Sequence, residues 1–145
     1  MDLLTSLKIS SSGLAANRKR MRAISSNIAN AETTRTAEGG PYRRKEVVFG
    51  AEPARETFSE ILEGEIDEKA QEVHATEVLS TNRPPILKYE PGHPDANEQG
   101  YVAYPNVNVM EEMANMISAS RSYEANISAF NTTKSMAAKA LELGR

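Results

Sequence analysis

Apolar residues recur at heptad spacing near both ends of this 145-residue chain, and this recurrence constrains the fold more than any other feature. Heptad stripes on helices form seams that pack against other helices. The sequence therefore predicts two long terminal helices whose seams pair with each other or with neighbouring subunits. The N-terminal stripe consists of Leu4, Leu7, Leu14, Met21, Ile24 and Ile28. The C-terminal stripe consists of Met113, Met116, Tyr123, Ile127, Phe130, Ala137 and Leu141, with Ser120 and Lys134 as polar interruptions.

The N-terminal helix is expected over residues 3–30, with Asp2 as its N-cap. Its weak point is the run Ser10-Ser11-Ser12-Gly13, because glycine costs a helix interior about 1 kcal/mol relative to alanine. Two interpretations stay open for this run. It is either a simple weakness in the helix or a small surface that admits a close neighbour.

The C-terminal helix is expected to begin after Asn108, which can accept from the free N–H groups of the first turn. Glu111 follows three residues later, in capping-box register. The stripe runs to Leu141, and Gly144 is expected to end the helix.

A small, irregular β region is expected between the helices. Short strands are predicted at 47–49, 73–79 and 101–104, the third pairing with one of the first two. The proline-rich stretch 82–108 is predicted to hold turns and no helix, because proline fixes φ and lacks an N–H donor. Residues 51–72 are acidic and are expected to form a loop with some helix.

The expected fold class is therefore mainly α with a small β region. The terminal helices pair as an antiparallel coiled coil around a short irregular β segment. We divide the chain into an N-terminal helix at 1–35, a middle segment at 36–106 with an acidic insertion at 51–72, and a C-terminal helix at 107–145.

Charge is distributed unevenly along the chain, whose net charge is −3. Residues 1–30 carry a net charge of +4, and residues 51–72 carry −6. Such asymmetry can orient subunits against each other, although ordinary solvated faces are the favoured explanation. The absence of cysteine excludes disulfides, thiolate nucleophiles and Cys-type zinc sites. No apolar run approaches membrane-spanning length. Residues 1–16 also lack the continuous apolar segment that a secretory signal requires.

The sequence offers little for catalysis. His93 and Asp95 could belong to a metal-dependent hydrolase, but no second histidine stands at ligand spacing, and the segment reads more simply as a turn. The basic run from Arg18 to Arg22 lacks the aromatic residues or motif of a nucleic-acid site. We therefore expect no catalytic, cofactor-binding or metal-binding residues, no nucleic-acid partner and no membrane insertion.

A set of motifs in order along the chain supplies a resemblance. The segment Ser25-Ser26-Asn27-Ile28-Ala29-Asn30-Ala31 resembles the Asn-Ile-Ala-Asn signature of the flagellar axial proteins, which are rod, hook and hook-associated subunits. Further stretches make the chain similar to the proximal rod subunits of that family: 41–49, 89–97, 100–102, 105–109, 112–113, 118–126 and 134–136. The resemblance covers roughly 1–50 and 73–145, whereas 51–72 matches nothing in it.

This resemblance implies a structural protein and not an enzyme. Its terminal helices would form an inner coiled-coil domain that lines the rod channel, and the middle segment would form a small outer part. Subunits of this kind leave the cell through the flagellar type III export apparatus without cleavage. They assemble with other rod subunits and with copies of themselves in the periplasmic rod of the basal body.

The candidate assembly residues combine the stripes with polar residues of the motifs. They are Leu7, Leu14, Met21, Ile24, Asn27, Ile28, Asn30, Met113, Met116, Arg121, Tyr123, Asn126, Ile127, Phe130 and Leu141. An alternative hypothesis from another class is a cytosolic coiled-coil adaptor that binds one partner and never polymerises. The heptads alone allow it, and the motif set argues against it.

Overall fold

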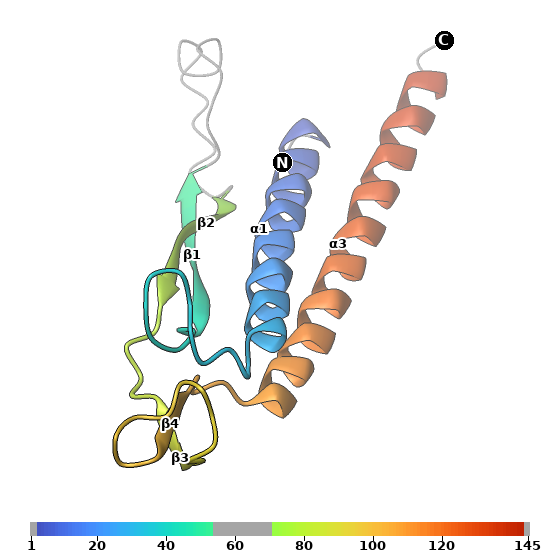
Figure 1. The fold of residues 1–145 in the computed structure, drawn as a ribbon. Coiled ribbons are helices and arrows are strands. Elements are labelled where there is room, and N and C mark those ends of the chain that lie inside the picture. Colours follow the sequence, from blue (N-terminus) through green and yellow to red (C-terminus); the bar gives the residue numbers. More distant parts are fainter. Residues whose placement is uncertain (1–2, 54–70, 144–145) are drawn as a thin grey trace.

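The computed structural model describes residues 3–53 and 71–143 (Figure 1). Two terminal helices flank a small β region, which confirms the coarse fold class. Asp2 and Gly144 lie outside the described residues, as does most of the acidic stretch 51–72. The elements in chain order are α1 (Leu3–Ala29), β1 (Lys45–Pro53), β2 (Gln71–Ser80), β3 (Ile86–Tyr89), β4 (Tyr101–Tyr104) and α3 (Val109–Leu143).

The helices α1 and α3 lie side by side and run in opposite directions (Figure 1). Gly13 of α1 lies against Asn126, whereas Asn27, two heptads further along α1, reaches back to Glu112 at the start of α3. A Cβ added to Gly13 would come within 2.9 Å of the Asn126 Nδ2 atom. The small residue at position 13 thus admits a close neighbour, as the second interpretation of the Ser10–Gly13 run expected.

Local side-chain hydrogen bonds set the helix ends. The Asn108 Oδ1 atom accepts from the backbone N–H groups of Met110 at 3.1 Å and Glu111 at 3.4 Å, which confirms Asn108 as the N-cap of α3. Beyond the last turn of α1, the Asn30 side chain donates to the carbonyl of Ser26 at 2.8 Å. The Ser26 carbonyl also accepts from the Asn30 backbone N–H at 3.1 Å, so Asn30 closes the end of the helix with both its backbone and its side chain.

Strands β1 and β2 form a two-stranded antiparallel ribbon whose register runs from Lys45 opposite Ser80 to Pro53 opposite Gln71. The predicted strands at 47–49 and 73–79 are confirmed and are longer than expected. An irregularity between Val48 and Phe49 shifts the register, as a β-bulge does. The ribbon packs against α1, which is needed because an isolated two-stranded ribbon is marginal in water.

The predicted pairing of the strand at 101–104 was wrong. Strand β4 pairs with β3, from Ile86 opposite Tyr104 to Tyr89 opposite Tyr101, and not with either longer strand. Strand β3 lies inside the stretch 82–108, where turns and the one strand at 101–104 were predicted. Proline at 84, 85 and 91 flanks these four residues without interrupting them. The strand was not predicted because the stretch around it is rich in proline.

Candidate assembly interface

A buried polar junction joins the end of α1, the start of β1 and the start of α3. The Glu112 and Asn27 side chains at its centre are each about 1% exposed. The Glu112 carboxylate accepts from Asn27 Nδ2 at 3.0 Å, from Arg44 Nε at 2.8 Å and from a terminal Arg44 nitrogen at 2.7 Å. Because a buried charge without a partner is strongly unfavourable, Glu112 holds Arg44 and Asn27 in fixed positions.

Asn27 also pairs with the free edge of β1. Its Oδ1 atom accepts from the Lys45 N–H at 2.8 Å, and its Nδ2 atom donates to the Lys45 carbonyl at 2.9 Å. The Tyr42 hydroxyl donates to the same Oδ1 atom at 2.9 Å, so the Ser26 hydroxyl, 3.0 Å from Tyr42, must donate to Tyr42. In the described part of the chain, no buried side-chain nitrogen or oxygen lacks a partner. Asn27 therefore connects three elements within the subunit.

Asn27 was predicted to contact neighbouring subunits, and Glu112, Arg44 and Tyr42 were not among the predicted assembly residues. The missed residues do lie in the motif stretches 41–49 and 112–113. A buried acid in the first turn of a helix resembles an ordinary dipole-favoured glutamate in sequence, so its partner 68 positions away could not be identified.

The seam of α3 follows steps of four and three. Among the described helices and strands, α1 is the one that packs against α3. The α3 residues that are buried or half-buried at heptad spacing therefore mark the side facing α1. They are Glu112, Met116, Ala119, Tyr123, Asn126, Phe130, Thr133 and Ala137.

The predicted C-terminal stripe divides between two sides of α3. Met116, Tyr123 and Phe130 lie in the seam, as does Asn126. Met113, Ile127 and Leu141 lie outside it and are 50%, 36% and 77% exposed. The apolar pattern missed half of the seam because Ala119, Asn126 and Thr133 are small or polar. The small residues let α1 approach closely. The apolar residues of the neighbouring heptad column, Met113, Ile127 and Leu141, therefore face outward.

The N-terminal stripe is also unevenly buried. Ile24 is buried, whereas Leu4 is exposed. Four other stripe residues are half-buried: Leu7, Leu14, Met21 and Ile28. Arg121 is exposed on α3, and Asn30 lies half-buried just beyond α1.

A compact apolar patch lies at the start of α3, on the side away from α1. Met110, Met113 and Ile117 are well exposed there, at spacings of three and four residues. At 100° per residue, Met110 and Ile117 lie nearly opposite Ala119 and Asn126 of the seam, and Met113 lies between Ile117 and the seam residue Met116. Of these three residues, only Met113 was a predicted assembly residue, because Met110 and Ile117 lie outside the predicted heptad stripe.

The segment that holds His93 is a turn. The His93 Nδ1 atom accepts from the Asp95 N–H at 3.1 Å, and the Asp95 carboxylate accepts from the Thr34 hydroxyl at 2.8 Å. Nowhere in residues 3–53 and 71–143 do three potential metal-ligating side chains gather as a metal site would require. None of the helices in those ranges combines the length and apolar character needed to cross a bilayer.

These features define a class of protein: a helix-pair subunit held in register by a buried polar junction, with apolar surface left for neighbours. Two family models agree with this class. Residues 7–35 match the model described as flagella basal body rod protein, and residues 98–143 match the one described as flagellar basal body rod FlgEFG protein C-terminal.

Full-length relatives narrow the class. The chain is 44% identical over 147 residues to the flagellar basal-body rod protein FlgC of Salmonella typhimurium, covering 100% of both chains. It is 41% identical over 152 residues to FlgC of Bacillus subtilis, again over both full lengths. It is also 41% identical over 152 residues to FlgC of Borreliella burgdorferi, covering 99% of this chain and 98% of that one. The chain belongs to the FlgC family of flagellar basal-body rod proteins.

Membership confirms the resemblance and the expectation of a structural protein. The family is a structural component of the rod and not an enzyme, so the hydrolase hypothesis has no support. The family also supports assembly with other rod subunits in the basal body of the flagellum. Nothing among these relatives favours the adaptor alternative.

Proposed function

We propose that this chain is a structural subunit of the proximal rod that polymerises through its terminal helices and helps to form the drive shaft and export channel. The observation that carries the proposal is the division of apolar residues on α3. One column packs on α1, and a second column of Met113, Ile127 and Leu141 remains exposed along the same helix. A helix with apolar residues on both sides is suited to an assembly in which neighbours cover the outer side.

We infer that α1 and α3 form an antiparallel coiled coil. The steps of four and three along the α3 seam support this, because a repeat of 3.5 residues keeps one side of a helix against its partner. The close approach of Gly13 to Asn126 also supports it. In this scheme residues 1–35 and 107–145 form the inner domain, and residues 36–106, with the acidic insertion at 51–72, form the outer part.

The buried junction gives the subunit the stiffness that torque transmission requires. Arg44, the residue just before β1, bonds to Glu112 of α3, and Asn27 of α1 bonds to Glu112 and to Lys45 of β1. Because each of these groups has partners on other elements, sliding α1 against α3 would break several buried hydrogen bonds at once. The outer β ribbon and the inner helices would therefore move as one body.

We further propose that the subunit is exported by the flagellar type III apparatus without a cleaved signal peptide. The absence of cysteine is consistent with a chain that crosses into an oxidising compartment unfolded, because no premature cross-link can form. The small buried core also suits this route, because little packing needs to be undone before passage.

The test is Ile127→Asp, which places a charge in the exposed apolar column. Since Ile127 is already 36% exposed, the isolated subunit should keep its fold, with less than about 1 kcal/mol lost. Rod assembly should fail, because a neighbour would have to bury the new carboxylate. Motility and recovery of the chain in purified basal bodies are the readouts.

The matched control is Ser128→Asp, which adds the same charge at the next, exposed position, outside the column of Met113, Ile127 and Leu141. We expect it to be tolerated better than Ile127→Asp. Normal motility and normal basal-body content for Ile127→Asp would refute assembly through this column.

A further inference from the structure

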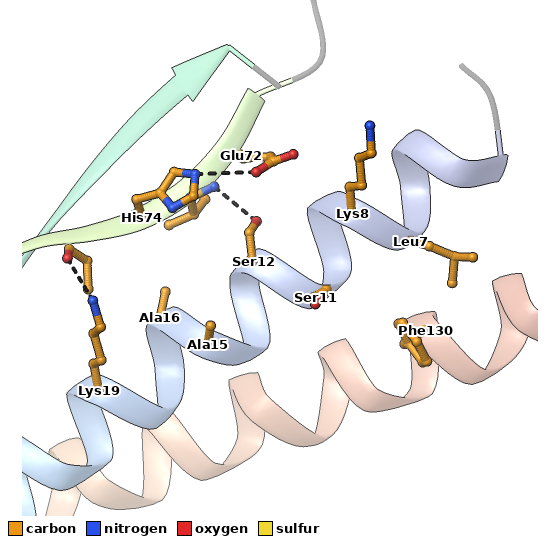
Figure 2. A pocket seen from close by; sticks show the side chains of 12 residues that line it. Leu7, Lys8, Ser11, Ser12, Ala15, Ala16, Lys19, Glu72, His74 and Phe130 are labelled. Carbon is orange, nitrogen blue, oxygen red and sulfur yellow. Dashed lines mark hydrogen bonds and ion pairs between the residues drawn. The ribbon is translucent and has the colours of Figure 1, made fainter. Parts of the chain in front are cut away.

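A groove runs along α1 beneath β2, with a volume of about 510 Å³ (Figure 2). Charges of both signs line it. Lys8 and Lys19 belong to α1, whereas Glu72 belongs to β2, where its carboxylate lies 3.3 Å from the Nε2 atom of His74. Because a carboxylate of the chain itself lies beside the lysines, this groove favours neither an acidic nor a basic partner.

A smaller pocket, which we call the arginine pocket, has charges of one sign. It has a volume of about 250 Å³ and lies between the turn that precedes β1 and the segment that follows β2. Three arginines line it, Arg43, Arg44 and Arg83, and the described residues of its lining include no aspartate or glutamate. The acids closest in sequence, Glu38 and Glu46, lie outside the lining. The rest of the lining is neutral and includes the prolines at 41, 84 and 85.

Hydrogen bonds hold the two sides of the arginine pocket together. The Thr81 N–H and the Thr81 hydroxyl both donate to the Arg44 carbonyl, at 2.8 and 2.9 Å. The Asn106 side chain donates to the Pro84 carbonyl at 3.1 Å, which ties the segment after β2 to the segment before α3. The pocket is therefore formed within the subunit and does not need an occupant to hold its shape.

Two of the three arginines have no acidic partner within the described chain. Arg44 is held by Glu112 at 2.7 Å and lies 3.7 Å from Glu46. Arg43 and Arg83 are exposed, and within residues 3–53 and 71–143 no carboxylate lies at ion-pair distance from either of them. A guanidinium group is a planar donor whose geometry matches a carboxylate. The pocket thus presents two such groups whose charge no described carboxylate neutralises.

We propose that the arginine pocket is a docking site for an acidic segment of a neighbouring protein chain. Arg43 and Arg83 each pair with a carboxylate of that segment, and the prolines of the wall contact the methylene groups of its acidic side chains. A small inorganic anion would engage the guanidinium groups and leave the prolines uncovered, so the pocket fits a peptide better. The proposal rests on the proposed rod function only in taking the partner to be a neighbouring protein.

Binding of a labelled acidic peptide to the full-length chain tests the site. The probe is the sequence of residues 51–72, which carries eight acidic residues against two basic ones. Within one copy this stretch leaves the ribbon at its far end, about 26 Å from the pocket along the nine residues of β1. Fluorescence anisotropy at low salt should show saturable binding. Binding should weaken as salt is added, because salt screens exposed charges.

Substitution of the two unpaired arginines locates the binding. Arg43→Gln and Arg83→Gln should each weaken it by about two- to five-fold, as loss of an exposed ion pair does. The double variant should weaken it by about four- to twenty-five-fold if the two losses add. Both side chains are exposed, so the variants should keep the circular dichroism spectrum of the parent.

The matched control is Lys139→Gln, which removes the same charge from an exposed position near the far end of α3. It should change the affinity by less than about two-fold, because an exposed charge at that distance is screened. An equal loss in Lys139→Gln and in the arginine variants would overturn the proposal, since the peptide would then respond only to net charge.

Three other results would also overturn the proposal. The first is the absence of saturable binding at peptide concentrations up to about 1 mM. The second is equal binding of a neutral peptide in which glutamine and asparagine replace the acidic residues. The third is complete displacement of the peptide by an equal concentration of inorganic phosphate, which would reduce the pocket to a small-anion site. Recovery of the chain in basal bodies tests the rod function separately, so failure of the docking site and failure of the rod function can be distinguished.

Discussion

Replacing Arg44 with methionine is expected to destabilise the subunit strongly, because methionine keeps an unbranched apolar stem but supplies neither the charge nor the N–H donors of arginine. The substitution leaves the carboxylate of Glu112, about 1% exposed, with Asn27 as its remaining hydrogen-bond donor. Arg44 is itself only 13% exposed, so solvent does little to screen the pair. Breaking one side of a buried ion pair costs about 3–5 kcal/mol.

That loss is large against the total stability of a domain, which is about 5–15 kcal/mol. For a chain of this length, about 1 kcal/mol corresponds to roughly 3–4 °C in melting temperature, so Arg44→Met should melt about 9–20 °C lower than the parent. The measurement is urea unfolding followed by circular dichroism, with the melting temperature as a second readout.

The double variant Arg44→Met, Glu112→Gln distinguishes a stranded charge from lost packing. Glutamine keeps an acceptor for Asn27 and removes the charge, so the double variant should recover at least half of the loss. The reasoning is wrong if Arg44→Met loses less than about 1 kcal/mol, or if the double variant is no more stable than the single one.

Three further predictions concern the packing of α1 against α3, the N-cap of α3, and the degree of structural order at the chain ends. Gly13→Leu should lower the free energy of unfolding by about 1–3 kcal/mol, measured by thermal unfolding, because its side chain meets Asn126. Adding Asn126→Ala should restore part of this loss. If Gly13→Leu loses no stability, the two helices lie further apart than this contact requires. Asn108→Ala should cost about 0.5–2 kcal/mol by removing the N-cap of α3, whereas Asn108→Asp should retain most of the stability in the same assay. Amide hydrogen exchange at the chain ends should be faster in the free subunit than in assembled rods, because neighbours bury the exposed apolar column; equal protection in both would count against neighbour-dependent order.

The features that sequence reasoning located well are local ones. The helix bounds depend on periodicity over adjacent turns and on a cap only two or three residues from the N–H groups it satisfies. The strands at 47–49 and 73–79 depend on β-forming residues in a short run. Such signals are contained in a few neighbouring positions, so no knowledge of the rest of the chain is needed to find them.

The features that were missed involve partners far apart in the sequence. Strand β4 pairs with β3 and not with the longer strands. This pairing depends on how the chain turns through Asn97, whose Oδ1 atom accepts from the Tyr101 N–H at 2.8 Å. The seam of α3 shifted toward Ala119 and Asn126 because the helices pack closely at Gly13. Hydrophobic periodicity is measured from apolar residues, so it does not detect a helix side whose residues are small or polar.

The sequence by itself determined two terminal helices, the Asn108 cap of the second, most of the strands and, through its ordered motifs, the rod family. Only the tertiary structure decided which column of α3 faces α1, that Asn27 lies inside the subunit, and that Arg44 meets Glu112. The reason is physical: helix periods and caps are short-range interactions within one segment, whereas a buried ion pair and a close helix contact exist only after distant segments exclude water from the same volume.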